Sequence, residues 1–334
     1  MPPLRWEHPY SGTATNSDPK MKSTVAVDFG GTGIKIGITR GAEILAKATP
    51  LATAAYDSPV SIIEAMCSTI RTLLQQHPDA GAIGLGMPGW TDFHRGVLYQ
   101  LTNVPVWNHE VAVRDIMQRE LGLPVVLDND ANCMAYAEWK LGAGQGLESL
   151  ACLTLGTGIG GGIIIHNRML RGKTVSAAEV GQTSIDWQGV PGPFGNKGAI
   201  EEYIGNQELS AEAAAAYAAV GIARNKEECT PYQLTLAASR GCPVATKLYE
   251  DYAHRLATLI MNLMYTIVPE AFIIGGGVAN AGELLMRPLL SSLKSQLFPV
   301  HYAALRVLPA HFGADAGLIG AGLMAADYLD GKLL

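Results

Sequence analysis

The feature that most constrains this 334-residue chain is a pair of glycine-rich turns. The first, D-F-G-G-T-G-I-K (Asp28–Lys35), follows an apolar run, and the second, G-T-G-I-G-G-G (Gly156–Gly162), follows another. Each turn joins two β-rich runs and predicts a hairpin whose backbone a ligand can approach closely. Glycine amides can direct several N–H groups at one anion, and Thr157 adds a hydroxyl donor. Phosphate is therefore the expected ligand of these turns.

The two turns lie about 125 residues apart, and such a recurrence predicts two similar half-molecules that face one nucleotide. The alternative is that each is a plain tight turn with no ligand. A third strand-to-glycine junction, I-I-G-G-G-V (Ile273–Val278), would let a flat ligand lie on bare backbone.

Composition narrows the class of protein. With 48% hydrophobic and 16% charged residues, the chain can bury large cores, and its length predicts two domains. The net charge of -6 gives no excess of basic residues with which to bind nucleic acid or an anionic membrane. No apolar run reaches the roughly 18 residues that a membrane helix needs. The scattered cysteines indicate reduced thiols and a cytoplasmic location; they are Cys67, Cys133, Cys152, Cys229 and Cys242.

Periodicity gives the expected organisation. We predict that residues 1–21 form a flexible tail. Residues 22–128 are predicted to form a small α/β domain, completed by a C-terminal helix at about 313–332. Residues 129–312 are predicted to form a large α/β domain. Helices are expected at about 59–76, 110–121, 211–223 and 244–268, the first with Val60 in its buried stripe.

A polar cluster, D-N-D-A-N (Asp128–Asn132), follows the apolar run of Val125–Leu127 and precedes a helical pattern. An aspartate at this junction would lie at the carboxyl edge of a sheet, where ligands of α/β proteins bind. It could act as a general base or hold a substrate hydroxyl, whereas the simpler interpretation is a helix cap. One cap explains one polar residue, so we favour function for the cluster.

These motifs together resemble the ROK family (repressor, ORF, kinase) of the sugar-kinase and actin-like ATPase superfamily. The resemblance covers nearly everything after Met21. It is carried by the segments above and by A-E-V-G at Ala178–Gly181 and I-E-E-Y at Ile200–Tyr203. It implies an α/β fold of two ribonuclease-H-like domains with an interdomain active-site cleft. It also implies an ATP-dependent kinase that uses Mg²⁺ and phosphorylates a glucose-like hexose, by expectation at the 6-hydroxyl.

The resemblance also implies roles for single residues. Asp130 matches the general base, and Asp28 matches the carboxylate that approaches Mg²⁺ through water. Residues matching ATP and phosphate ligands are Gly30, Gly31, Thr32, Lys35, Gly156, Thr157, Gly158, Gly276 and Gly277. Residues matching sugar ligands are Gly89, Asn103, Asn129, Asp130, Glu179, Gln182 and Glu201.

The chain departs from the family at its zinc motif. Many members carry a histidine three residues after the first glutamate and a cysteine-rich run before the second, but those places here hold Gln182, Gly192, Phe194 and Ala199. None is a zinc ligand, so no structural zinc is expected, and Phe194 and Ala199 are expected to pack the same loop through apolar contacts. Polyphosphate glucokinases also lack this motif, which keeps polyphosphate open as the phosphoryl donor.

Other functions within the family remain open alternatives. Its repressors carry a helix-turn-helix before the first glycine turn, and the 23 residues before Thr24 show no helical periodicity or basic cluster, so DNA binding is not expected. A sugar-binding protein without catalysis is the second alternative, although it would not require Asp28, Asp130 and both turns. The acceptor could also be N-acetylmannosamine, fructose or allose, and the resemblance further implies a homodimer.

Overall fold

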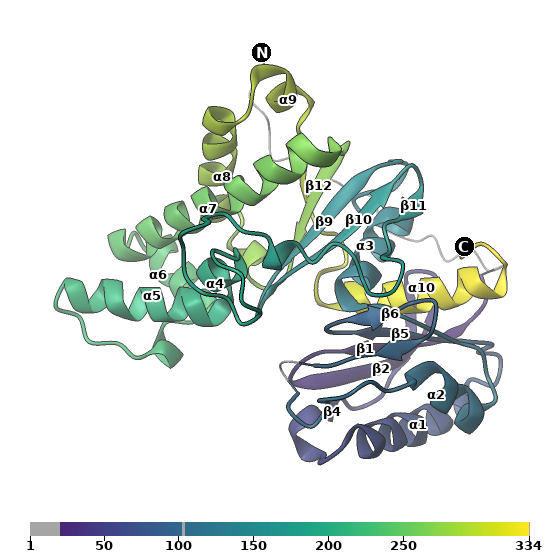
Figure 1. The fold of residues 1–334 in the computed structure, drawn as a ribbon. Helices are drawn as coiled ribbons and strands as arrows, with labels where there is room; N and C mark the ends of the chain where they lie inside the picture. The colour runs from purple at the N-terminus through teal and green to yellow at the C-terminus, as the bar shows by residue number, and fades with distance from the viewer. Residues whose placement is uncertain (1–20, 102–103, 334) are drawn as a thin grey trace. The chain divides into compact units, whose positions relative to one another are not determined.

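The computed structural model describes residues 21–101 and 104–333, so the predicted tail up to residue 20 and Asn103 lie outside the described residues. The chain forms two compact units. The first unit contains residues 21–147, 162–178 and 311–333, and the second contains residues 148–161 and 179–310. Both are mixed α/β structures, as predicted (Figure 1).

The first unit is built on a mixed sheet in the order β3-β2-β1-β5-β8, with β4 paired to β2. Strand β1 pairs antiparallel with β2 and parallel with β5, and β5 pairs parallel with β8. The strands of this sheet are β1 (Thr24–Phe29), β2 (Gly33–Arg40), β3 (Glu43–Lys47), β4 (Leu51–Ala52), β5 (Ile83–Met87) and β8 (Val125–Asn129). A separate antiparallel pair is formed by β6 (Thr91–Asp92) and β7 (Val97–Leu98).

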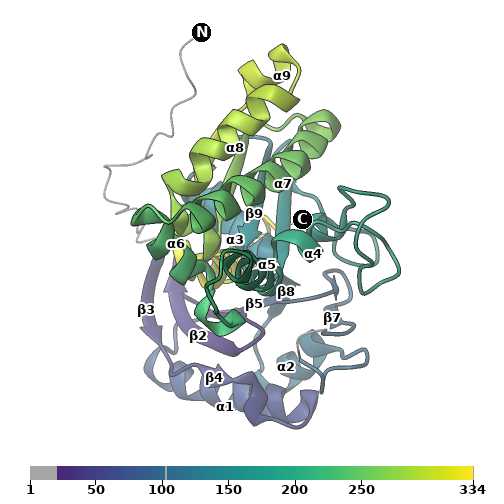
Figure 2. The same cartoon turned by 90° about the vertical axis from the view of Figure 1, so that its left-hand side faces the viewer.

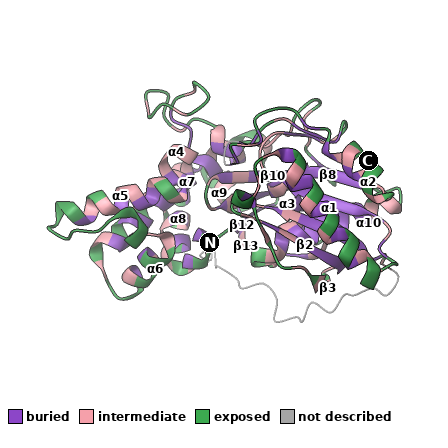
Figure 3. Ribbon diagram, turned by 90° about the horizontal axis from the view of Figure 1, so that it is seen from below, coloured by how far each residue is buried: buried purple, intermediate pink, exposed green. Residues whose placement is uncertain are grey.

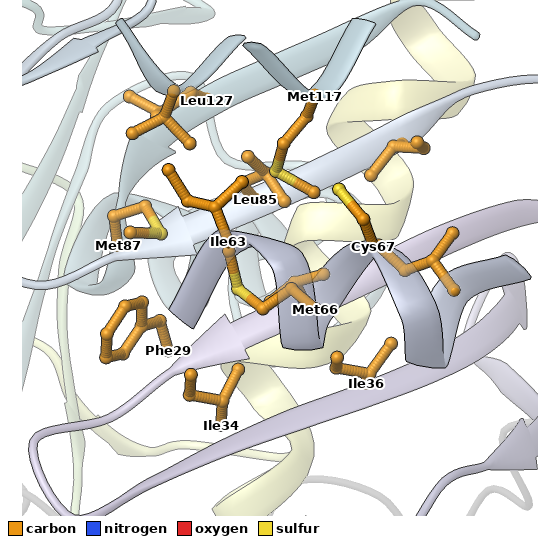
Figure 4. Close-up of a cluster of buried hydrophobic side chains, with 14 of the residues drawn as sticks. Phe29, Ile34, Ile36, Ile63, Met66, Cys67, Leu85, Met87, Met117 and Leu127 are labelled. Atoms are coloured by element: carbon orange, nitrogen blue, oxygen red, sulfur yellow. The ribbon is translucent and has the colours of Figure 1, made fainter. Parts of the chain in front are cut away.

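Four helices cover this sheet, α1 and α2 on one face and α3 and α10 on the other (Figure 1). They are α1 (Pro59–Gln76), α2 (Val113–Leu121), α3 (Asp130–Leu141) and α10 (Ala316–Leu329). Helix α1 has the predicted bounds because Ser58 and Ser61 form a capping box and Pro59 fits the first turn. Figure 4 shows its buried stripe, including Ile63 and Met66, packed on side chains of the sheet.

Helix α10 comes from the far end of the chain and packs on α3, β1 and β5. Its backbone lies close both to the sheet and to α3 because each contact includes a glycine. A Cβ atom on Gly84 of β5 would overlap the Ala321 carbonyl, and one on Gly320 would overlap the carbonyl of Cys133 in α3. The Thr24 hydroxyl donates to the Gly322 carbonyl at 3.0 Å, which joins the first strand to the last helix.

The second sheet has the order β11-β10-β9-β12-β13, the same pattern of a glycine-turn strand pair followed by two further strands. Strand β12 pairs parallel with both β9 and β13. The strands are β9 (Leu150–Leu155), β10 (Ile159–Ile165), β11 (Arg168–Met169), β12 (Ala271–Gly275) and β13 (Val307–Pro309). The chain passes from the second unit to the first within β10. The predicted likeness of the two halves is thus visible in their strand order.

The helices of the second unit include a long pair, α7 and α8, that lie side by side (Figures 1 and 2). The unit contains α4 (Glu201–Ile204), α5 (Asn206–Ala219), α6 (Pro231–Ser239), α7 (Pro243–Ile267), α8 (Glu283–Gln296) and α9 (Pro299–Ala304). Short 3₁₀ helices of the chain are Thr53–Ala55, Val180–Gln182, Lys226–Glu228, Val278–Ala281 and Gly313–Asp315.

Three sequence predictions need correction. The helix expected from about 211 begins at Asn206, directly after Gly205, and the helix expected from about 110 begins at Val113. Val60 is 59% exposed because it lies in the first turn of α1, beyond the part that meets the sheet.

The strands themselves are largely buried, whereas the helices carry exposed residues on their outer faces (Figure 3).

Candidate functional site

The first glycine turn joins β1 to β2 and places Asp28 opposite Lys35. The Lys35 ammonium donates to Asp28 Oδ2 at 2.9 Å and to the Ala314 carbonyl at 2.7 Å. The Gly30 N–H donates to the Gly33 carbonyl and closes the turn. Asp28 Oδ1 lies beside Gly317 in the first turn of α10, where a Cβ atom would approach within 2.8 Å. Asp28 is therefore a partly exposed carboxylate held by a lysine and a helix N-terminus.

Asp128 ends the β8 run as a buried charge with a complete set of partners. Its Oδ1 accepts from the Asn129 N–H and from Asn132 Nδ2, both at 2.8 Å, and its Oδ2 accepts from Arg171 Nε at 2.7 Å. The Arg171 guanidinium also stacks on the Phe93 ring at 3.9 Å. Asp128 is 1% exposed, so its oxygens are committed to holding the strand end and the following segment.

Asn129 caps α3, which confirms the simpler interpretation for this residue. Its Oδ1 accepts from the N–H groups of Ala131 and Asn132 at 2.9 and 3.3 Å. Its Nδ2 donates to the Gly89 carbonyl at 3.2 Å and fixes the loop after β5. Gly89 has φ +74°, and a Cβ atom there would lie 2.7 Å from the Gln100 carbonyl, so the position requires glycine.

Asp130 is the first residue of α3, where the partial positive charge of the helix N-terminus attracts a carboxylate. It is partly exposed, and its Oδ1 accepts from the Ala131 N–H at 2.9 Å. Burial raises the pKa of the Cys133 thiol well above its usual value, and Asp128, Asp130 and Asp28 raise it further. The carboxylates predicted from β1 and from the β8–α3 junction are thus brought to one edge of the first sheet, around Cys133.

The second glycine turn lies between β9 and β10. The Gly156 N–H donates to the Gly158 carbonyl at 3.1 Å, and the Gly160 N–H donates to Thr154 Oγ1 at 3.1 Å. The Asn206 N–H, at the start of α5, donates to the Gly156 carbonyl at 3.1 Å. No atom lies within 4 Å of the place where a Gly156 Cβ would be, so the turn leaves open space at this position. That space suits an anion approaching the backbone.

Glu201 supports the same turn. Its Oε2 accepts from the Ile159 N–H at 2.8 Å, and a Cβ atom on Gly158 would overlap that oxygen. Its Oε1 accepts from Gln182 Nε2 at 3.2 Å. Two residues predicted as sugar ligands are therefore in direct contact with each other, and one of them contacts the predicted phosphate turn.

The loop between Glu179 and Glu201 is closed by hydrogen bonds. The Gln182 N–H donates to the Glu179 carbonyl at 3.1 Å, so Glu179 precedes the short 3₁₀ helix that ends at Gln182. Of the residues at the zinc-motif positions, Ala199 is buried as predicted, but Phe194 is 46% exposed. About half of the Phe194 side chain therefore faces solvent, beside the turn at Gly195, where φ is +84°.

The junction after β12 brings bare backbone beside the second turn. Gly276 has φ +87°, and a Cβ atom there would overlap the Leu155 carbonyl, so only glycine fits. Gly277 has open space around its Cα, with no atom within 4 Å of a Cβ position. Since Gly275 pairs with Thr154, these glycines lie at the same sheet edge as Gly156. The predicted adenosine and phosphate positions of the second unit are thus neighbours.

Two contacts in the site were not foreseen from the sequence. Arg171 holds Asp128 from 43 residues away, and no local pattern indicates that partner. Asn206 supports Gly156 through its backbone, a contact that follows from where α5 begins. Asn103, a predicted sugar ligand, lies outside the described residues.

The chemistry of Asp28 is compatible with a magnesium ion held through water. Within residues 21–101 and 104–333, no group of three or more histidine, cysteine, aspartate or glutamate side chains could hold a metal ion. Mg²⁺ in phosphoryl-transfer sites keeps several waters and needs only one or two carboxylates besides the phosphates. A single, partly exposed carboxylate at the first glycine turn meets that requirement.

The fold, with glycine turns at the edges of its sheets, defines a class of two-unit α/β protein, and comparison identifies the family. The ROK family model matches residues 24–328, so the chain belongs to the ROK family. A glucokinase of Streptomyces coelicolor is 33% identical over 329 residues, covering 92% of this chain and 98% of the relative.

Solved structures agree. The crystal structure of a ROK family glucokinase from Streptomyces griseus in complex with glucose and AMPPNP is 32% identical, with a TM-score of 0.77, and the match covers 91% of this chain and 99% of that one. The ROK hexokinase from Thermus thermophilus also has 32% identity and a TM-score of 0.77, over 93% and 99% of the two chains. The expected fold class, two α/β domains of the actin-like ATPase type, is confirmed. None of the described helices has the length and apolar character needed to cross a membrane.

Proposed function

We propose that this protein is an ATP-dependent sugar kinase that transfers the γ-phosphoryl group to a hexose hydroxyl, with glucose as the first candidate and its 6-hydroxyl as the acceptor. Similarity to glucokinases over nearly the whole chain supports the class of reaction. The base is assigned on the different surroundings of the three polar residues where β8 meets α3. Asp128 and Asn129 are occupied by structural bonds, and Asp130 is the partly exposed carboxylate at the sheet edge.

In this proposal, Asp130 accepts the proton of the attacking hydroxyl, and the start of α3 keeps its carboxylate ionised until then. Asn129, Gly89, Asn103, Glu179, Gln182 and Glu201 are assigned to the sugar, directly or through one another. Carboxylates and amides suit a polyol because they accept or bridge neighbouring hydroxyls. The Asn129 Oδ1 is used in the helix cap, so its Nδ2, which also donates to the Gly89 carbonyl, is the group assigned to the sugar.

The nucleotide is assigned to the glycine positions. Gly30, Gly31, Thr32, Gly156, Thr157 and Gly158 present backbone and hydroxyl donors to phosphate oxygens, and Gly276 and Gly277 lie under the adenosine. Lys35 contributes positive charge while it keeps Asp28 oriented. Mg²⁺ bound with the nucleotide would neutralise the charge that develops on the phosphates. Asp28 would orient a water of that ion.

The test is a coupled assay of ADP release with ATP and Mg²⁺ over a panel of hexoses that includes glucose, mannose, fructose, allose and N-acetylmannosamine. Asp130→Asn should lower kcat by about 10²- to 10⁴-fold on the best sugar, the range for loss of a general base. Its unfolding midpoint should stay near that of the wild type. Asp315→Asn, an exposed carboxylate paired with Lys47, serves as the control for a charge change.

Equal activity of Asp130→Asn and wild type would show that the base is wrongly assigned. Turnover with polyphosphate but not with ATP would show that polyphosphate is the phosphoryl donor. Sugar-dependent thermal shifts without turnover from either donor would show that the protein senses a sugar and does not phosphorylate it. A cytoplasmic location and assembly as a homodimer are further proposals from family resemblance. Light scattering of the purified protein tests the dimer.

A further inference from the structure

Glu201 makes contacts on both of its carboxylate oxygens, and the two contacts belong to different parts of the candidate site. Oε2 accepts from the Ile159 N–H at the exit of the second glycine turn. Oε1 accepts from Gln182 Nε2, in the segment that follows Glu179. A single side chain therefore connects the predicted phosphate turn to the predicted sugar segment, all within the second unit.

The orientation of the Gln182 amide is fixed by its partner. An ionised carboxylate only accepts hydrogen bonds, so the NH₂ group of Gln182 must face Glu201 and its Oε1 must point away. That Oε1 is buried and has no protein partner in the described chain. The Gln182 carbonyl in turn accepts from Asn196 Nδ2 at 3.0 Å. Gln182 is thus held on its backbone side and delivers one donor to Glu201.

The loop that carries Gln182 closes on itself without help from Glu201. The Ile185 N–H donates to the Gly198 carbonyl at 2.8 Å, and the Ile200 N–H donates to the Thr183 carbonyl at 3.1 Å. These bonds leave the Gln182–Glu201 contact as a separate connection, which can be removed while the loop remains folded. The effect of this one contact is therefore measurable.

We propose that Gln182 is a positioning residue that holds Glu201 against the second glycine turn, and that this connection couples sugar binding to nucleotide binding. The coupling rests on the proposed function, whereas the positioning does not. A carboxylate that moves to meet a sugar hydroxyl changes its bond to the Ile159 N–H, and a nucleotide that orders the turn fixes the carboxylate. By linkage, each ligand must change the affinity of the other by the same factor.

The first experiment measures hydrogen exchange of the Ile159 amide by NMR in the ligand-free protein. Gln182→Met keeps the shape of the side chain but removes its donor, and Gln182→Glu keeps the shape and adds a like charge. We expect exchange at Ile159 to rise by about tenfold in Gln182→Met, the order expected for weakening a hydrogen bond to a charged group, and further in Gln182→Glu. Gln188→Met, the control, changes an exposed residue of the same loop, and in this variant the Ile159 amide should exchange at the wild-type rate.

The amides of Ile185 and Ile200 report whether the loop itself has opened. If they lose protection together with Ile159, Gln182 only maintains the loop and the positioning role is wrong. A packing role predicts equal effects of the isosteric Met and Glu substitutions, so their ranking is a second discriminating result. Unchanged exchange at Ile159 in both variants would also overturn the proposal.

The second experiment measures the Kd of glucose by calorimetry with and without AMPPNP and Mg²⁺. The wild type should bind glucose with different affinity in the two conditions, and Gln182→Met should bring the ratio close to one. An equal ratio in wild type and variant would overturn the coupling. If the wild type binds no glucose, the sugar assignment has failed, and the exchange experiment still decides the positioning of Glu201.

Discussion

Arg171 Nε lies 2.7 Å from Asp128 Oδ2, and the two side chains are 12% and 1% exposed. This ion pair fixes the end of β8 next to the proposed base Asp130. Asp128 also accepts two further hydrogen bonds, so its charge is fully compensated. Asp128 is therefore structural, and Asp130, two residues later, carries the proposed chemistry.

Removing one partner of this pair should leave an uncompensated buried charge. Asp128→Asn should lower the free energy of unfolding by about 3 kcal/mol or more, in contrast to Asp130→Asn. Urea denaturation measures both. The comparison variant is Asp315→Asn, whose exposed pair with Lys47 contributes less than about 1 kcal/mol. A small effect of Asp128→Asn, like that of Asp315→Asn, would contradict the structural role.

Two glycines of the second turn should respond differently to alanine. Gly158→Ala places a methyl group on Glu201 Oε2, so it should lower both the unfolding midpoint and the affinity for AMPPNP. Gly156→Ala fills open space, so stability should stay within about 0.5 kcal/mol of the wild type.

Gly156→Ala should nevertheless weaken AMPPNP binding by about tenfold, equivalent to roughly 1.4 kcal/mol, because the methyl group occupies the space assigned to a phosphate. Calorimetric titration gives the affinity, and thermal unfolding gives the stability. Wild-type affinity in Gly156→Ala would show that no phosphate lies against this glycine.

Cys242 should be the most reactive cysteine. The hydrogen bond from the Tyr217 hydroxyl, 3.4 Å from Sγ, lowers the pKa of the Cys242 thiol, and the backbone N–H of Ala245 at the start of α7 lowers it further. Burial raises the pKa of Cys67, Cys133 and Cys229 instead. The Cys242 thiolate therefore forms at lower pH than that of an ordinary cysteine, and its alkylation rate should level off at lower pH.

Mass spectrometry after brief iodoacetamide treatment at pH 8 should find Cys242 modified first. Cys242→Ser should remove the fast phase, and Tyr217→Phe should shift the pH dependence upward because its hydroxyl is lost. Faster labelling at Cys229 would contradict the assignment, since that thiol is fully buried.

Chelation should separate the two metals considered for this family. The loop of residues 183–200 is closed by backbone bonds such as Ile185 N–H to the Gly198 carbonyl, so EDTA should leave the unfolding midpoint unchanged. Kinase activity should disappear with EDTA and return with Mg²⁺ alone. Elemental analysis that found one zinc per chain in the purified protein would refute the prediction.

Local sequence patterns predicted those parts of the fold whose causes are local. The glycine turns and α1, with its capping box at Ser58, depend on neighbouring residues and were placed correctly. The start of α5 was missed because its alanine-rich sequence has little apolar periodicity, and the helix begins where Asn206 meets Gly156. That determinant lies in the turn between β9 and β10 and cannot be seen in the segment itself.

The site was predicted at the level of motifs more than of side-chain roles. The sequence placed Asp28, Asp130 and the glycines at sheet edges, because strand ends carry that information. The family resemblance assigned the base to Asp130, but the local pattern could not show the bonds that Asp128 and Asn129 make, since these involve Arg171 and Gly89, far away in the chain. It also assigned Gln182 and Glu201 as independent ligands, whereas the structure joins them by a hydrogen bond.

The packing of α10 on β1 and β5 has a consequence for biosynthesis. One face of the first sheet is covered by α3 and by α10, which follows the whole second unit in the sequence, and the Thr24 hydroxyl bonds to the Gly322 carbonyl almost 300 residues later. Domains usually fold as they emerge, in order from the N-terminus. Here the first unit can be completed only after the second has been synthesised, so the part of the sheet face that α10 covers stays exposed on the nascent chain until then.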